Sequence, residues 1–119
     1  MDGKELKWTG SSLKDLTAFP DSARREAGYQ LHRVQFGMEP DDWKPFKTVG
    51  PGVREIRIKE AGGIYRVVYV AKFEEAIYVL HAFQKKTGKT ALKDITVATV
   101  RYQAILAHRT RGKQDGHLH

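Results

Sequence analysis

Two long stretches of the chain place apolar residues at helical spacing. In residues 20–36 the apolar positions recur every three or four residues: Ala23, Ala27, Leu31 and Val34. This single apolar stripe predicts an amphipathic helix that covers a sheet. Gly37 follows it, where a left-handed cap commonly ends a helix.

The second helical stripe lies near the end of the chain. It comprises Ile95, Ala98, Tyr102, Ile105 and Leu106. We expect a helix from about Ala91 or Asp94 to His108, with Thr90 as its N-cap and Asp94 at the positive end of the helix dipole. A shorter helix over residues 11–19 and a short strand over residues 5–8 are also predicted.

Between these helices the pattern changes to that of strands. Residues 53–59 alternate, with Ile56 and Ile58 on one face and Glu55, Arg57 and Lys59 on the other, which is typical of a half-buried strand. Residues 64–72 and 76–84 are apolar on both faces and therefore predict central strands. Their short connections, one of them the turn Ala61-Gly62-Gly63, predict an antiparallel meander.

The proline- and glycine-rich stretch 38–52 reads as a loop. We expect Trp43 and Phe46 to anchor it by packing, with base stacking as the alternative. Residues 109–119 read as a polar, flexible tail. The chain is thus expected to form a single domain over residues 1–108, followed by this tail.

Composition excludes several classes of protein. The chain has 119 residues and no cysteine, so it carries no disulfide framework and no thiolate metal site. No apolar run approaches the roughly 18 residues that a membrane helix needs. We therefore expect a cytoplasmic protein that does not bind membranes.

The positive charge is concentrated in the last third of the chain. The net charge is +7, and residues 81–113 carry eight basic side chains and one acidic one. Such a concentrated field favours a polyanionic partner, nucleic acid first. The alternative is a solvated basic helix and tail.

Arg66 is the most informative single residue. It shares a strand face with Ile64, Val68 and Val70, and a guanidinium in apolar surroundings is costly unless it is paired. Two interpretations remain open. Either Arg66 pairs internally with Glu55 or Glu60, or that end of the face is open and Arg66 binds an anion.

Further cations are expected near Arg66. A hairpin about Gly62-Gly63 brings Arg57 roughly opposite Arg66, and Lys85, Lys86 and Lys89 leave the next strand. Arginine offers a bidentate fork for phosphate, and fixed cations stabilise the charge that builds when an RNA 2′-hydroxyl attacks its own phosphate. A lysine crowded by cations has a lowered pKa and suits a general base. This chemistry needs no metal and no cofactor.

His81 is expected on a strand face with Ile77, Val79 and Phe83 as same-face neighbours. A core histidine with satisfied hydrogen bonds is favoured over a catalytic one.

Several short motifs together resemble the RelE/HigB superfamily of toxins, and its phage-derived branch most closely. They are Glu55-Ile56-Arg57, Tyr65-Arg66-Val67, Leu80-His81 and the segment Phe83 to Thr87. With the flanking helices the resemblance spans about residues 5–108. It implies an α+β fold, RelE-like, with N-terminal helices packed on a mostly antiparallel sheet and a C-terminal helix.

The resemblance also implies a function. Members are usually toxins of type II toxin–antitoxin modules, many cleave mRNA in the ribosomal A site without metal, and a cognate antitoxin, often a helix-turn-helix protein, neutralises them. Carried over, Arg57 and Arg66 clamp the scissile phosphate, Lys85 and Lys86 stabilise charge with one of them as base, and Lys89 holds neighbouring backbone or ribosomal RNA. Four further basic residues are expected to bind RNA: Lys93, Arg101, Arg109 and Arg111.

The chain departs from the branch in two places. Ala91 stands where a proline is common, which affects only the start of the helix. Relatives place a tyrosine or histidine near the C-terminus for stacking or acid–base work, whereas here Tyr102 is expected in the core and His108 is the other candidate. The alternative function is a non-catalytic toxin or RNA-binding module of the same fold, directed at another target such as DNA gyrase.

Overall fold

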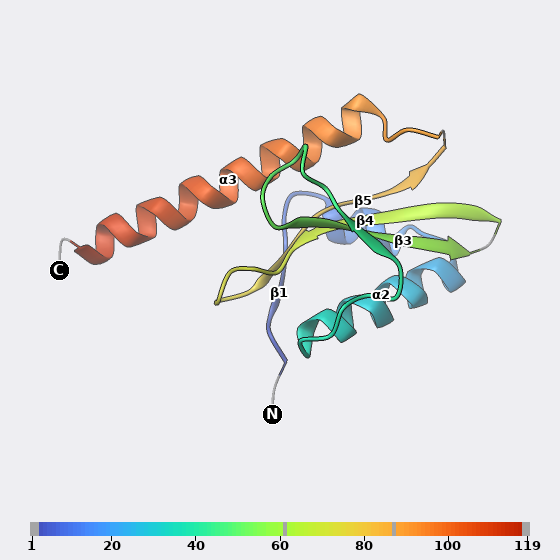
Figure 1. Ribbon diagram of the computed structural model, residues 1–119, viewed down its shortest axis with the longest axis horizontal. Helices are drawn as coiled ribbons and strands as arrows, with labels where there is room; N and C mark the ends of the chain where they lie inside the picture. Colours follow the sequence, from blue (N-terminus) through green and yellow to red (C-terminus); the bar gives the residue numbers. More distant parts are fainter. Residues whose placement is uncertain (1–2, 61, 87, 118–119) are drawn as a thin grey trace.

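A five-stranded sheet with the strand order β1-β5-β4-β3-β2 organises the chain (Figure 1). The computed structural model describes residues 3–60, 62–86 and 88–117, so Ala61 and Thr87, which belong to the predicted turn and motif, lie outside it. The strands are β1 (Leu6–Trp8), β2 (Trp43–Pro45), β3 (Val53–Glu60), β4 (Gly63–Val70) and β5 (Ile77–Lys85). Only β1, which pairs with β5, is parallel to its neighbour. The α+β class and the antiparallel meander are confirmed.

Helices α1 (Ser12–Thr17) and α2 (Asp21–Gln35) cover one face of this sheet. The four predicted stripe positions of α2 are all buried there, packed with strand residues that include Ile56, Ile58, Val67 and Val79. Gly37 adopts the expected left-handed conformation, with φ of 83°. The apolar stripe therefore identified both the helix and the face that it buries.

Helix α3 (Leu92–His117) covers part of the opposite face. Its residues Ala98, Tyr102 and Ile105 pack against strand residues that include Val53, Val68 and Leu80. The Tyr102 hydroxyl donates a hydrogen bond to the Pro51 carbonyl, 3.2 Å away, so Tyr102 is a core residue as expected.

The ends of α3 differ from the sequence-based bounds. The helix begins at Leu92, so Thr90 is not its N-cap, although Asp94 does lie in the first turn. At the other end α3 continues through residues 109–117, and Figure 1 shows this part extending away from the sheet. The flexibility expected of residues 109–119 stays a prediction.

The predicted loop 38–52 contains a short strand, which corrects the sequence analysis. Strand β2 pairs with β3 at the edge of the sheet, where Pro45 is tolerated because its missing N–H faces no partner strand. The Arg54 guanidinium lies 4.0 Å from the centre of the Trp43 ring, and Phe46 packs against the core under α3. Both aromatic residues thus anchor the segment.

A β-bulge in β5 changes which side chains share a face. Val68 pairs with His81 and Tyr69 with Val79, so Leu80 is an extra residue on β5. Val79 and Ala82 both belong to the core under α1 and α2, whereas Leu80 lies under α3 and Phe83 pairs with Arg66. The expectation that His81 shares a face with Ile77 and Val79 was therefore wrong, because strict alternation stops at the bulge.

Within the described residues, no helix is both long enough and apolar enough to cross a membrane.

Candidate nucleic-acid interface

The α3 face of the sheet has a covered half and an open half. In the open half Arg57 of β3 pairs in register with Arg66 of β4, and Arg66 in turn pairs with Phe83 of β5. One step towards the strand ends, Ile64 pairs with Lys85 and keeps 36% of its surface exposed. Since residues paired in register project to the same face, these side chains from three strands line one patch.

Arg66 forms the floor of this patch and is internally paired. Its Nη1 donates to Oε1 of Glu55 over 2.7 Å, and the two side chains are 5% and 0% exposed. This decides between the two interpretations of the sequence, in favour of a pair with Glu55. Glu55 shares a strand face with Arg57 as predicted, but the half-buried pattern expected of this strand fails at Glu55, which is fully buried.

The Arg66–Glu55 pair is incompletely hydrogen-bonded. Among the residues that the structure describes, Oε2 of Glu55 and Nε of Arg66 are both buried without a hydrogen-bond partner. Burial lowers the pKa of Arg66, and the carboxylate of Glu55 opposes this effect. Desolvation of the two groups offsets much of the attraction within a buried pair of this kind.

Arg57 is held differently, at the surface. Its guanidinium donates to the Asp42 carboxylate over 2.9 Å, and both side chains are about 40% exposed. The sequence analysis missed Asp42, because it lies just before the unpredicted strand β2 and no spacing rule connects it to β3. The Arg57 guanidinium is therefore accessible from solvent and already bound to one carboxylate.

Lys85 is surrounded by other cations. Its pKa is lowered, first by burial and then by the charges of Arg66 and Lys44, while Glu55 opposes the shift. Nζ of Lys44, on β2, lies 3.7 Å from Oε1 of Glu55. The sequence analysis did not identify Lys44 as part of this patch. Lys44, Arg57 and Arg66 therefore lie near enough to Lys85 for their charges to act on it.

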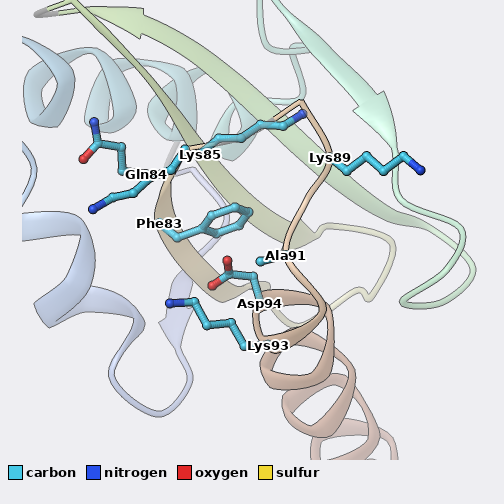
Figure 2. Close-up of a pocket in the computed structure, with 8 residues that line it drawn as sticks. Phe83, Gln84, Lys85, Lys89, Ala91, Lys93 and Asp94 are labelled. Atoms are coloured by element: carbon cyan, nitrogen blue, oxygen red, sulfur yellow. The ribbon is translucent and has the colours of Figure 1, made fainter.

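A pocket of about 410 Å³ adjoins this patch, between the end of β5 and the start of α3 (Figure 2). Four of the predicted lysines line it: Lys85, Lys86, Lys89 and Lys93. Phe83 and Asp94 are also in its wall, and Figure 2 shows the Phe83 ring between Lys85 and Asp94. The pocket combines positive charge with an aromatic surface.

His81 is fixed beside this pocket. Its Nε2 lies 2.8 Å from Oδ1 of Asp94, and its ring stacks on Phe83 with 4.9 Å between centroids. Nδ1 is buried and has no hydrogen-bond partner within residues 3–60, 62–86 and 88–117. His81 is thus buried as expected, and within this part of the chain one of its two nitrogens is hydrogen-bonded.

The other predicted RNA-binding arginines lie away from the patch. Arg101 donates to the Leu80 carbonyl over 2.8 Å and to the Ser11 hydroxyl over 3.0 Å. Arg109 pairs with the Glu75 carboxylate, and its guanidinium lies 4.0 Å from the Phe73 ring centre. Both therefore hold α3 in place, whereas Arg111 is exposed on the extending part of the helix.

His108 does not lie near the patch. It is exposed on α3, fourteen residues beyond Asp94, which corresponds to about 21 Å along the helix axis. His108 is therefore no acid–base candidate for chemistry at Arg57 and Lys85.

The helices packed on a five-stranded, mostly antiparallel sheet are consistent with a RelE-like fold. Residues 14–103 match the family model described as phage derived protein Gp49-like (DUF891). Because the match covers more than half of the chain, the protein belongs to this family, which is associated with toxins of toxin–antitoxin modules of the RelE-superfamily type. No curated protein matches the chain.

Proposed function

We propose that the protein is the toxin of a type II toxin–antitoxin module and that it cleaves mRNA on the ribosome without a metal ion. Membership of the Gp49-like family supports the toxin role. The observation that carries the nuclease assignment is the position of Lys85, whose pKa is lowered by burial and by the neighbouring cations Arg66 and Lys44. A lysine with a lowered pKa gives up its proton more readily than an ordinary lysine, which makes Lys85 the candidate base.

The cleavage step follows from these groups. Neutral Lys85 takes the proton of the RNA 2′-hydroxyl as that oxygen attacks the adjacent phosphorus. The bond from phosphorus to the 5′-oxygen of the next nucleotide breaks, the 5′-oxygen leaves with the electron pair of that bond and takes a proton from water, and a 2′,3′-cyclic phosphate remains. Arg57 releases Asp42 and binds the phosphoryl oxygens, where a fixed cation stabilises the developing charge. Lys86 contributes further positive charge.

Arg66 acts mainly through its neighbours in this scheme. Its guanidinium is buried and held by Glu55, so direct contact with a phosphate requires that Glu55 give up the hydrogen bond. Its charge nevertheless lowers the pKa of Lys85. We therefore assign Arg66 to tuning Lys85 and to the floor of the phosphate site.

The remaining lysines extend the RNA contact. Lys89 and Lys93 line the adjoining pocket, and Arg111 is exposed further along α3. Phosphate contacts of this kind position a nucleic acid without reading its sequence. They suit mRNA backbone or ribosomal RNA. A cognate antitoxin, of the helix-turn-helix type, is the second expected partner.

A specific observation favours a second candidate function. Both arginines of the patch are paired with carboxylates, Arg57 with Asp42 and Arg66 with Glu55, which lowers the net charge that a phosphate meets. A non-catalytic toxin of the same fold, directed at another target such as DNA gyrase, needs no cationic cleavage site.

Expression of the chain from an inducible promoter tests these alternatives. Primer extension on mRNA from arrested cells is expected to show cuts at codon boundaries, and Arg57→Gln is expected to remove both the cuts and the arrest. Arg24→Gln is the matched control, because Arg24 forms an exposed pair with Asp21 on α2. Intact mRNA together with arrested DNA replication would support the second candidate and exclude the nuclease.

A further inference from the structure

The pocket between β5 and α3 contains more than a phosphate site needs. Phosphate binding requires only cations, yet the aromatic ring of Phe83 forms part of the wall beside Lys85 and Lys93 (Figure 2). Partly buried aromatic rings next to lysines are the elements from which single-stranded nucleic-acid sites are built, because every base has a face that stacks on a ring.

We propose that this pocket is a subsite for one unpaired nucleotide, in which the base stacks on Phe83 and the flanking phosphates contact Lys86 and Lys93. The assignment rests on the proposed function, since it places a nucleotide of the RNA substrate beside the cleavage patch. The volume of about 410 Å³ falls within the range of small-molecule sites, roughly 300–1,000 Å³.

The Phe83 ring is held rigidly, as a stacking platform should be. It stacks on His81 with an interplanar angle of 23°, and His81 is bound through Nε2 to Asp94. The side chains of His81 and Asp94 are only 9% and 14% exposed. Because Asp94 lies in the first turn of α3, the platform is fixed by a strand and a helix together. Little side-chain entropy remains to be lost when a base binds.

The position of the pocket suits a neighbouring nucleotide rather than the scissile one. Phe83 pairs in register with Arg66, and Lys85 belongs to both the patch and the pocket. A base on Phe83 therefore places its own phosphate group next to Lys85. Stacking at this point orients the RNA for the cleavage step, so Phe83 is a positioning residue and His81 supports it.

Binding of a non-cleavable RNA tests the subsite directly. The probe is a 2′-O-methyl tetraribonucleotide with a fluorescent label, compared with versions in which one position at a time lacks its base. For the wild-type protein we expect one abasic position to weaken binding about tenfold. Phe83→Leu, which keeps apolar volume but removes the ring, is expected to weaken the intact probe about tenfold and to leave that abasic probe unaffected. Phe83→Trp is expected to retain binding.

A matched control is Phe36→Leu, since Phe36 is an aromatic residue on the far side of the sheet with 49% exposure; its affinity for the probe should equal that of the wild type. Equal weakening of the intact and abasic probes by Phe83→Leu would overturn the subsite, as would unchanged binding in that variant. Thermal unfolding of each variant separates these results from a folding defect, and Phe83→Trp keeps the test valid if the leucine variant unfolds.

The failure of this inference differs from the failure of the proposed function. If the wild type cleaves mRNA at codon boundaries but shows no base-dependent binding through Phe83, only the subsite is overturned. If base-dependent binding is present and mRNA stays intact, the subsite stands and the nuclease proposal fails.

Discussion

Arg57 and Arg66 pair in register across β3 and β4, yet each binds a different carboxylate. Like charges directly opposite each other destabilise a sheet, and Asp42 and Glu55 offset that repulsion separately. The environments of the two arginines also differ, because Arg57 is 39% exposed and Arg66 only 5%. Replacing Arg57 therefore tests chemistry at the surface, whereas replacing Arg66 tests the stability of the core.

Arg66→Ala should destabilise the fold strongly. It leaves the Glu55 carboxylate buried without its main partner, and breaking a buried pair in this way costs about 3–5 kcal/mol. Urea unfolding measures the change. The double variant Arg66→Met with Glu55→Met is expected to recover most of the loss, because no uncompensated charge remains. A loss below about 1 kcal/mol in Arg66→Ala would contradict the structural role of the pair. Because Arg66→Ala is expected to destabilise the fold, loss of toxicity in Arg66→Ala does not by itself make Arg66 a catalytic residue.

Arg57→Gln should separate activity from stability. The Arg57–Asp42 pair is exposed, so its removal is expected to cost less than about 1 kcal/mol. Cleavage on ribosomes should fall on the order of a hundredfold, because a fixed cation at the phosphate is lost. Asp42→Asn should keep cleavage, since it removes the competitor for Arg57. Identical cleavage rates for Arg57→Gln and the Arg24→Gln control would exclude Arg57 from the site.

The pH dependence of cleavage should report on Lys85. A base works in its neutral form, so the rate should rise with pH up to the pKa of Lys85, which burial and nearby cations lower from its usual value. Lys44→Met removes one of these cations and therefore raises that pKa. The rising limb of the pH–rate profile should move to higher pH, whereas Lys47→Met, a change in the exposed loop after β2, should leave it in place. A profile unaffected by Lys44→Met would argue against Lys85 as the base.

Alanine substitutions at two glycines, Gly28 and Gly50, should change stability in opposite directions. A Cβ added at Gly28 in α2 meets nothing within 4 Å, so Gly28→Ala should raise the free energy of unfolding by about 0.5–1 kcal/mol through helix propensity. A Cβ at Gly50 would overlap the buried Tyr102 ring. Gly50→Ala should therefore lower it by about 1–3 kcal/mol. Thermal unfolding of the two variants side by side checks both signs; equal effects would contradict the packing of Tyr102 against this loop.

Much of the fold was predictable because its elements repeat a regular period. The stripe of α2 and the apolar runs of β4 and β5 identified two layers and the central strands. The opposition of Arg57 and Arg66 followed from counting residues about a glycine turn. These features depend on residues that are close together in the sequence, so one sequence is enough to predict them.

The missed features depend on contacts distant in sequence or on broken periods. Strand β2 has three residues and a proline, so it forms through pairing with β3 and not through propensity. Asp42 and Lys44 approach the patch only because β2 is there. The burial of Glu55 beneath Arg66 could be seen only in the structure. The sequence left open whether Arg66 pairs with Glu55, pairs with Glu60 or binds an anion.

The bulge at Leu80 makes the interface depend on residue count as well as on residue type. A chain lacking only Leu80 would keep Phe83 and Lys85 on their present face, because the strand on either side of the bulge is already in register with β4. Loss or gain of one residue elsewhere in the paired part of β5 would exchange its two faces. Lys85 would then enter the apolar layer beneath α1 while Ala82 reached the face that carries Arg66, with every charge of the sequence unchanged.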